Sequence, residues 1–227
     1  IIFMATGDVI SQTNLNDAYN LMVRKSDIEQ LNDFEVLSEE ELAGVEGSPY
    51  ENRKFIMGNI YQNDKLVLKN VPLRYNSFAD EIEMKQNSSD TEYNALIKNP
   101  EYFVKMFNDV YIFVPKNSSN EEGGYFKIIT SGKHFDLYKK STTTYLAPRE
   151  ARTSYEVAQP AKFVTKDTYF LMSKDGKLGE LPTNRNKISK VLTSRTKEIK
   201  KFIDKNRLDL EQEADMARLI EYYNSIL

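Results

Sequence analysis

The sequence predicts an α+β fold, in which an antiparallel β-meander of about eight to ten strands forms a barrel- or sandwich-like curled sheet beside a C-terminal two-helix hairpin. Three observations support this fold. Short runs of alternating polar and apolar residues recur between residues 55 and 181. Pairs of turn-forming residues separate these runs: Asn63 with Asp64, Asn108 with Asp109, and Asp175 with Gly176. After residue 185, the spacing of apolar residues lengthens to that of a helix.

The middle of the chain is predicted to consist of strands. Strand candidates cover residues 55–61, 66–75, 81–85, 93–97, 103–107, 111–114, 125–130, 134–138, 162–164, 169–172 and 178–181. Pro72 marks an edge or a bulge, because proline cannot donate a hydrogen bond to a neighbouring strand. Glu81 and Glu83 alternate with Ile82 and Met84. We therefore expect the isoleucine and the methionine in the core and the two glutamates in water.

Two helices are predicted at the C-terminus, over residues 186–205 and 210–224. Apolar residues at helical spacing form one face of each: Ile188, Val191, Leu192, Ile199, Phe202 and Ile203 in the first, and Leu210, Met216, Leu219, Ile220 and Tyr223 in the second. Asn206 suits the end of the first helix, and Asp209 with Gln212 fits a capping box at the start of the second.

The chain is predicted to hold one β-rich domain over residues 13–227. Residues 1–12 are expected to be the remnant of a signal peptide, because an apolar stretch is followed by Ser11 and then by Gln12, before which cleavage is expected. The alternative is a short N-terminal strand. Export of the chain would place the protein in the periplasm or outside the cell.

The composition excludes several kinds of site. The 227 residues include no cysteine and one histidine, so disulfides, thiol nucleophiles, zinc–thiolate sites and iron–sulfur clusters are ruled out. No cofactor and no metal site is predicted. The net charge of −3 argues against nucleic acid as the partner. No run of 18 apolar residues is present, so no transmembrane segment is predicted.

Two arrangements resemble catalytic sites. Ser131, His134 and Asp136 supply the residue types of a nucleophile, base and acid, but one short strand can rarely place all three correctly, and a solvent-facing strand histidine is favoured. Glu81 and Glu83 share a strand face in the manner of glycosidase carboxylates. A solvated strand face is favoured for this pair, and no catalytic residue is predicted.

Charge and aromatic residues suggest three binding surfaces. Residues 185–207 contain nine basic and two acidic side chains, which form either a patch for lipid, polysaccharide or nucleic acid, or a solvated helix face complemented by acids elsewhere in the chain. The recurrent tyrosines allow glycan stacking or ordinary strand packing. The long polar stretch 141–160 is either a connector or a recognition loop. Its candidate binding residues are Tyr145, Arg149, Arg152 and Tyr155.

Six blocks carry a family resemblance: GSPY from residue 47, VPLRYN from 71, DEIE from 80, LYKK from 137, AKFVTKDTYF from 161 and LIEYYNS from 219. Over residues 45–227, their order resembles a family of uncharacterised exported proteins of Bacteroidetes, especially flavobacteria. The resemblance implies a periplasmic or secreted location and assigns no activity and no catalytic residue.

These observations predict a non-catalytic, exported cell-envelope binding or accessory protein, with an envelope protein as its partner in a larger assembly. One alternative is a carrier that holds a small apolar ligand within the curled sheet, which requires a large internal pocket lined by Phe and Met. The other is a carboxylate-based hydrolase, which requires three or more acids in one cleft.

Overall fold

The computed structural model describes residues 12–26, 45–118, 120–151 and 157–227. The expected signal-peptide remnant falls outside these residues except for Gln12, which begins helix α1 (Gln12–Met22). Tyr19 and Met22 on this helix are buried, in agreement with their helical spacing in the sequence. The acidic residues between 27 and 44 also fall outside the described part of the chain.

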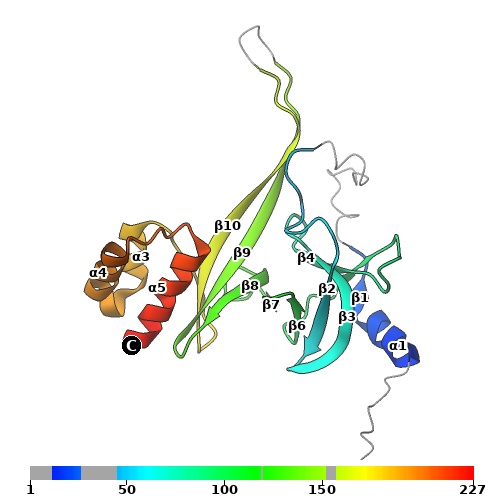
Figure 1. The fold of residues 1–227 in the computed structure, drawn as a ribbon, viewed down its shortest axis with the longest axis horizontal. Helices are drawn as coiled ribbons and strands as arrows, with labels where there is room; N and C mark the ends of the chain where they lie inside the picture. The colour runs from blue at the N-terminus through cyan, green and yellow to red at the C-terminus, as the bar shows by residue number, and fades with distance from the viewer. Residues whose placement is uncertain (1–11, 27–44, 119, 152–156) are drawn as a thin grey trace, which may run out of the picture.

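The described residues form one antiparallel sheet of eleven strands, in the order β1-β5-β4-β3-β2-β6-β7-β8-β9-β10-β11 (Figure 1). The strands are β1 (Val23–Arg24), β2 (Ile56–Gln62), β3 (Lys65–Asn76), β4 (Glu81–Met84), β5 (Asn94–Leu96), β6 (Tyr102–Met106), β7 (Asp109–Val114), β8 (Gly124–Ser131), β9 (Phe135–Leu146), β10 (Lys162–Ser173) and β11 (Leu178–Leu181). The α+β prediction is therefore confirmed. The curled sheet does not close, because β1 and β11 remain as its edges.

The first C-terminal helix is interrupted, so the prediction of one helix over residues 186–205 is wrong. Helix α3 (Arg185–Val191) ends at Leu192, a 3₁₀ turn follows (Thr193–Arg195), and helix α4 (Thr196–Asn206) continues the chain. Leu192 is fully buried, and its ψ of 62° turns the backbone out of the helix. The turn lets apolar residues of both helices enter one core, while Val191 stays 43% exposed.

The last helix also starts later than expected. Helix α5 spans Glu213–Ile226, and its cap residue Gln212 makes no side-chain capping bond. Instead, the Asp215 carboxylate accepts a hydrogen bond from the backbone N–H of Asp209 at 2.9 Å. Leu210 is buried ahead of the helix, in the linker. The prediction of a helix over residues 210–224 is thus correct, but the helix starts three residues later and ends two residues later than expected.

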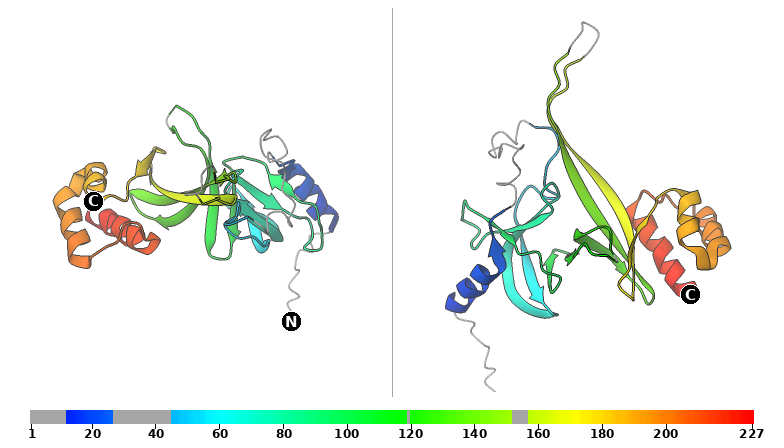
Figure 2. Two further views of the ribbon diagram at one scale, coloured as in Figure 1. Left: turned by 90° about the horizontal axis from the view of Figure 1, so that it is seen from above. Right: turned by 180° about the vertical axis from the view of Figure 1, so that it is seen from behind.

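Three clusters of buried side chains hold the sheet. The first packs α1 against the N-terminal half of the sheet and includes Tyr19, Leu73, Ile82, Met84, Val104 and Tyr111. The second packs α3, α4 and α5 against its C-terminal half and includes Leu137, Leu171, Ile188, Leu192, Met216 and Ile220. The third contains Val114, Phe126, Tyr138 and Phe170, which alternate along their strands with residues of the other clusters and so face the opposite side. Helix α1 and the C-terminal helices consequently lie at opposite ends of the sheet (Figures 1 and 2).

Strands β9 and β10 form a long two-stranded arm that rises from the sheet (Figure 1). They pair over twelve residues, from Phe135 opposite Ser173 to Leu146 opposite Lys162. A further bridge between Arg149 and Gln159 extends the pairing. The prediction of a polar loop from residue 141 onward is therefore wrong for residues 141–146, where three consecutive threonines, which favour strands, continue β9.

Asn224 on α5 ties the C-terminal helix to the turn between β8 and β9. Its side-chain oxygen accepts hydrogen bonds from the backbone N–H groups of His134 (2.9 Å) and Phe135 (3.0 Å). Its amide nitrogen donates to the carbonyls of Phe135 and Ile220, each at 3.0 Å. All four hydrogen-bonding positions on this carboxamide are thus used.

We expect Asn224→Ala to lower the free energy of unfolding by about 1–3 kcal/mol, because it leaves partly buried backbone groups without partners. Urea denaturation of the variant measures this loss. Asn206→Ala is the matched control, since among the described residues the Asn206 amide donates only to the carbonyl of Phe202. Equal effects of the two substitutions would contradict the role assigned to Asn224.

Candidate functional site

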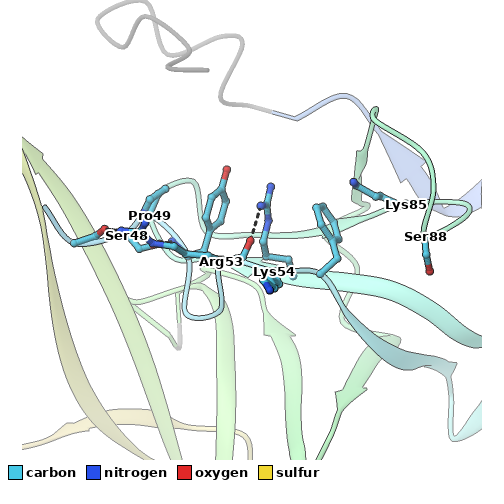
Figure 3. A pocket seen from close by; sticks show the side chains of 10 residues that line it. Ser48, Pro49, Arg53, Lys54, Lys85 and Ser88 are labelled. Atoms are coloured by element: carbon cyan, nitrogen blue, oxygen red, sulfur yellow. Dashed lines mark hydrogen bonds between the residues drawn. The ribbon is translucent and has the colours of Figure 1, made fainter. Parts of the chain in front are cut away.

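A surface cavity of about 410 Å³ lies over β3, bounded by residues 47–55 and by the segment that follows β4. Its lining residues are Gly47, Ser48, Pro49, Tyr50, Arg53, Lys54, Phe55, Arg74, Lys85 and Ser88. Four of them are basic and none is acidic. Lys85 and Ser88 face the cavity from one side, and Ser48, Pro49 and Arg53 from the other (Figure 3). We call this cavity the cationic pocket; its volume falls in the usual range for small-ligand sites.

Arg74 forms the buried base of the cationic pocket. It lies on β3 directly opposite Glu83 of β4, and two of its guanidinium nitrogens donate to one carboxylate oxygen of Glu83 at 2.8 and 2.5 Å. A third nitrogen donates to the carbonyl of Arg53 at 3.0 Å. Arg74 is 3% exposed and Glu83 is fully buried. The pair is therefore a desolvated ion pair, and its hydrogen bonds fix the guanidinium in place.

Aromatic rings surround the Arg74 guanidinium. Its central carbon lies 3.6 Å from the ring centroid of Tyr50, 4.3 Å from that of Phe55 and 5.3 Å from that of Tyr93. The ammonium of Lys85 lies 4.6 Å from the Phe55 centroid. Cation–π attraction holds these groups together, so the aromatic wall and the cations of the pocket form one ordered unit.

Backbone hydrogen bonds attach the first residues of the pocket segment to the sheet. Glu46 donates to the carbonyl of Ala161, just ahead of β10, and accepts from Phe163 on β10. Gly47 has a φ of +83°, and a Cβ at this position would lie 2.4 Å from the carbonyl oxygen of Phe163, so only glycine fits. The carbonyl of Pro49 accepts from the backbone N–H of Ser77 at 2.9 Å. Backbone hydrogen bonds to the sheet therefore fix the position of this wall of the pocket.

Glu81 and Glu83 are fully buried, so the prediction that they face water is wrong. Glu81 binds Arg24 and accepts from the Ser26 hydroxyl at 2.5 Å. Glu83 accepts from Asn76 at 2.7 Å in addition to Arg74. Burial raises the pKa of Glu83, and the charge of Arg74 opposes this shift. Because their oxygens are bound by side chains of the protein, the two carboxylates are not placed to act on a substrate.

The structure does not assemble Ser131, His134 and Asp136 into a catalytic set. His134 lies in the turn between β8 and β9, where its backbone binds Asn224, and not on a strand as predicted. Asp136 accepts from Lys174 at 2.7 Å and from the backbone of Gly132 at 3.0 Å. No hydrogen bond joins the three candidate side chains within the described residues.

Two of the four predicted binding residues lie on the β9–β10 arm. Tyr145 is half-buried, with its ring 5.2 Å from that of Phe163. Arg149 is exposed near the end of the arm. Arg152 and Tyr155 fall outside the described residues. The structure does not bring Tyr145 or Arg149 into the lining of the cationic pocket.

A belt of charges connects the pocket segment with the C-terminal helices. Lys127 and Lys139 lie opposite each other on β8 and β9 and are largely buried. Glu213 on α5 binds both, at 3.5 Å from Lys127 and 2.7 Å from Lys139. Lys127 also lies 3.7 Å from Glu51. We call Glu51, Lys127, Lys139 and Glu213 the charge belt. Burial lowers the pKa of Lys139, but its hydrogen bond to Glu213 and the nearby Asp167 carboxylate outweigh burial and raise it.

Few of the basic side chains on the C-terminal helices form ion pairs within the described structure. Arg185 pairs with Asp204 at 3.4 Å. Six lysines of α3 and α4 are exposed and make no ion pair with a described residue: Lys187, Lys190, Lys197, Lys200, Lys201 and Lys205. On the outer face of α4, solvation therefore outweighs internal charge pairing.

Neither a membrane-spanning helix nor a metal cluster is found in the described part of the chain. No helix there is both long and apolar enough to cross a membrane. No group of three or more histidine, aspartate or glutamate side chains among the described residues is placed to hold a metal ion. Comparison with known proteins finds no matching family model, no matching curated protein and no matching solved structure.

Proposed function

We propose that this protein is a non-catalytic binding protein whose cationic pocket holds the anionic group of a ligand. The observation that carries the proposal is the pocket lining, which contains four basic side chains and no acid. Glu83 neutralises Arg74, so the charge available to a ligand comes from Arg53, Lys54 and Lys85. Charge-assisted hydrogen bonds to such groups are among the stronger polar contacts in proteins.

The pocket also offers an apolar surface beside its charges. Tyr50 and Phe55 line it and are held in position by Arg74. A ligand that joins an anionic group to a compact apolar face satisfies both features. The apolar-carrier alternative has less support, because Phe55 is the only phenylalanine or methionine lining this cavity. The hydrolase alternative has less support because Glu81 and Glu83 are each paired with an arginine.

The pocket is tested by removing its available charges. We expect Arg53→Gln, Lys54→Gln and Lys85→Gln in one variant to weaken binding of glucuronate at least tenfold, because charge-assisted hydrogen bonds are lost. Isothermal titration calorimetry with glucuronate, and with glucose as its uncharged counterpart, measures the change. The matched control replaces three exposed lysines outside the pocket by glutamine: Lys65, Lys105 and Lys166. Equal binding by the two variants, or tighter binding of glucose, would overturn the proposal.

We further propose that the protein is exported and acts in the cell envelope together with an envelope protein. The apolar residues ahead of Gln12 and the resemblance to exported Bacteroidetes proteins support this location. Fractionation of cells that express the precursor, followed by N-terminal sequencing, tests it. Recovery of the chain from the cytoplasm with Ile1 still attached would contradict the proposal.

A further inference from the structure

Six lysines that form no ion pair with a described residue lie on the outermost helices of the molecule. We call them the lysine surface: Lys187 and Lys190 on α3, and Lys197, Lys200, Lys201 and Lys205 on α4. Helix α5 packs on β8 and β9, and α4 packs in turn on α5 and on α3. The helices that carry the lysines therefore form the end of the molecule opposite α1 (Figures 1 and 2).

On α4, the lysines lie on the side of the helix that faces water. Lys197, Lys200 and Lys201 are three and four residues apart, so their side chains are neighbours on one face, and Lys205 extends this face by another turn. Ile199 and Ile203 are buried on the other side, in the core that α4 shares with α5. The ammonium groups of α4 consequently point away from the core.

The acidic side chains of α5 do not neutralise the lysine surface. Glu213 binds two lysines of the sheet. Asp215 pairs with Arg218 at 3.1 Å. Glu221 accepts a hydrogen bond from the Thr130 hydroxyl at 3.3 Å. Internal complementarity between the basic stretch and the last helix, one of the interpretations of the sequence, is therefore not what the structure shows.

Charge is distributed unevenly between this end of the molecule and the remainder of the chain. Residues 185–207 carry nine basic and two acidic side chains, a surplus of seven positive charges, whereas the whole chain carries −3. The remainder therefore has a net charge of −10. An anionic surface attracts the end that carries α3 and α4 and repels the rest, so it orients the molecule with these helices toward it.

We propose that the lysine surface binds the anionic headgroups of a lipid bilayer. A cluster of about four to eight basic residues on a helix is typical of proteins that bind anionic membranes. Lysine is a point charge without the paired donors of arginine, which suits mobile headgroups. Val191 is 43% exposed one turn from Lys187 and adds an apolar contact at the membrane interface.

Nucleic acid is a weaker candidate for this surface. Proteins that bind single strands stack successive bases on exposed aromatic rings. Phe202 is the only aromatic residue between 185 and 207, and its ring is stacked on that of Tyr222 at a centroid distance of 3.9 Å. A bilayer needs no such ring, because it is held by charge alone.

The expected binding is peripheral and sensitive to salt. The apolar side of α4 is already buried against α5, so the helix has no second apolar face to insert among the lipid chains. Attraction between exposed charges is screened by salt. This proposal does not depend on the cationic pocket, which none of the six lysines lines.

Sedimentation of the intact protein with vesicles tests the proposal, with phosphatidylcholine alone or mixed with about one third phosphatidylglycerol. We expect binding to the anionic vesicles only, weakened at least tenfold when NaCl is raised from about 0.05 M to about 0.5 M. We expect a helix variant, with Lys190→Gln, Lys197→Gln, Lys200→Gln and Lys201→Gln, to bind at least tenfold more weakly. Arginine at the same four positions should restore binding, because it keeps the charge.

The matched control replaces four exposed lysines of the sheet by glutamine and so changes the net charge equally: Lys65, Lys69, Lys105 and Lys166. We expect it to bind as the wild type does. Lysine and glutamine have similar helix propensities, so the helix variant should keep its fold, which circular dichroism checks.

Four results would overturn the proposal: no binding to anionic vesicles, equal binding to both kinds of vesicle, equal losses in the helix variant and its control, or loss of vesicle binding in the pocket variant instead of the helix variant. Alginate and single-stranded DNA serve as soluble polyanions in the same experiment. Tighter binding of either than of the anionic vesicles, at equal concentration of negative charge, would assign the lysine surface to a soluble polyanion and overturn the lipid assignment.

Discussion

Replacing Arg74 by methionine is expected to lower the free energy of unfolding by about 3–5 kcal/mol, the cost of removing one partner of a buried ion pair. Glu83 is fully buried and receives two hydrogen bonds from Arg74. Without the guanidinium, the carboxylate keeps its bond from Asn76 and loses its counter-charge. Urea denaturation at neutral pH measures the loss. Arg53→Met is the matched control, since Arg53 is exposed, and we expect a change within about 0.5 kcal/mol there.

The loss caused by Arg74→Met should shrink as the pH falls. Burial already raises the pKa of Glu83, so the native protein binds this proton more tightly than the unfolded chain does. Removing Arg74 raises that pKa further, because the attraction that favours the ionised form is gone. Protonation then relieves the unpaired charge in acid. A difference in unfolding free energy between wild type and variant that is constant from neutral to acidic pH would contradict this account.

A loss of similar size, about 3–5 kcal/mol, is expected for Phe126→Ala, because a cavity replaces a fully buried ring. Phe126 packs edge-on against Phe170 at a centroid distance of 5.2 Å and lies 6.3 Å from Tyr138. These rings form the core on the side of the sheet opposite the C-terminal helices. Thermal and urea denaturation should report the same loss.

Phe107→Ala is the control for Phe126→Ala, because the ring of Phe107 is 72% exposed at the turn between β6 and β7. We expect a change within about 0.5 kcal/mol for it. A loss from Phe126→Ala as small as the one expected for Phe107→Ala would show that the third cluster contributes little to stability.

The sheet was predictable because its strands carry local signals. Alternation and turn residues locate most strands within a few positions, and Ile82 and Met84 are buried as expected. The break at Leu192 was not predictable in this way. Ile188 and Leu192 continue the helical spacing, and only the position of the shared core makes the chain turn there.

The candidate site was much less predictable than the fold. Alternation places Glu81 and Glu83 correctly on one face, but it cannot show that residues 24–26 and 47–55 cover that face. Arg53, Arg74 and Lys85 come from separate segments with no common spacing. The predicted surface at residues 141–160 was chosen for its length and polarity, and these properties describe an extended strand pair equally well.

The charge belt couples the local unfolding of α5 to that of the segment that forms the cationic pocket. Glu51 sits in the segment that forms the cationic pocket, and Glu213 begins the last helix. Both contact Lys127, so detaching α5 exposes this largely buried ammonium to water, which screens its attraction to Glu51 in the pocket segment. Backbone amides in α5 and in residues 47–55 should therefore exchange with deuterium through a common opening event. A ligand that protects one from exchange would then also protect the other.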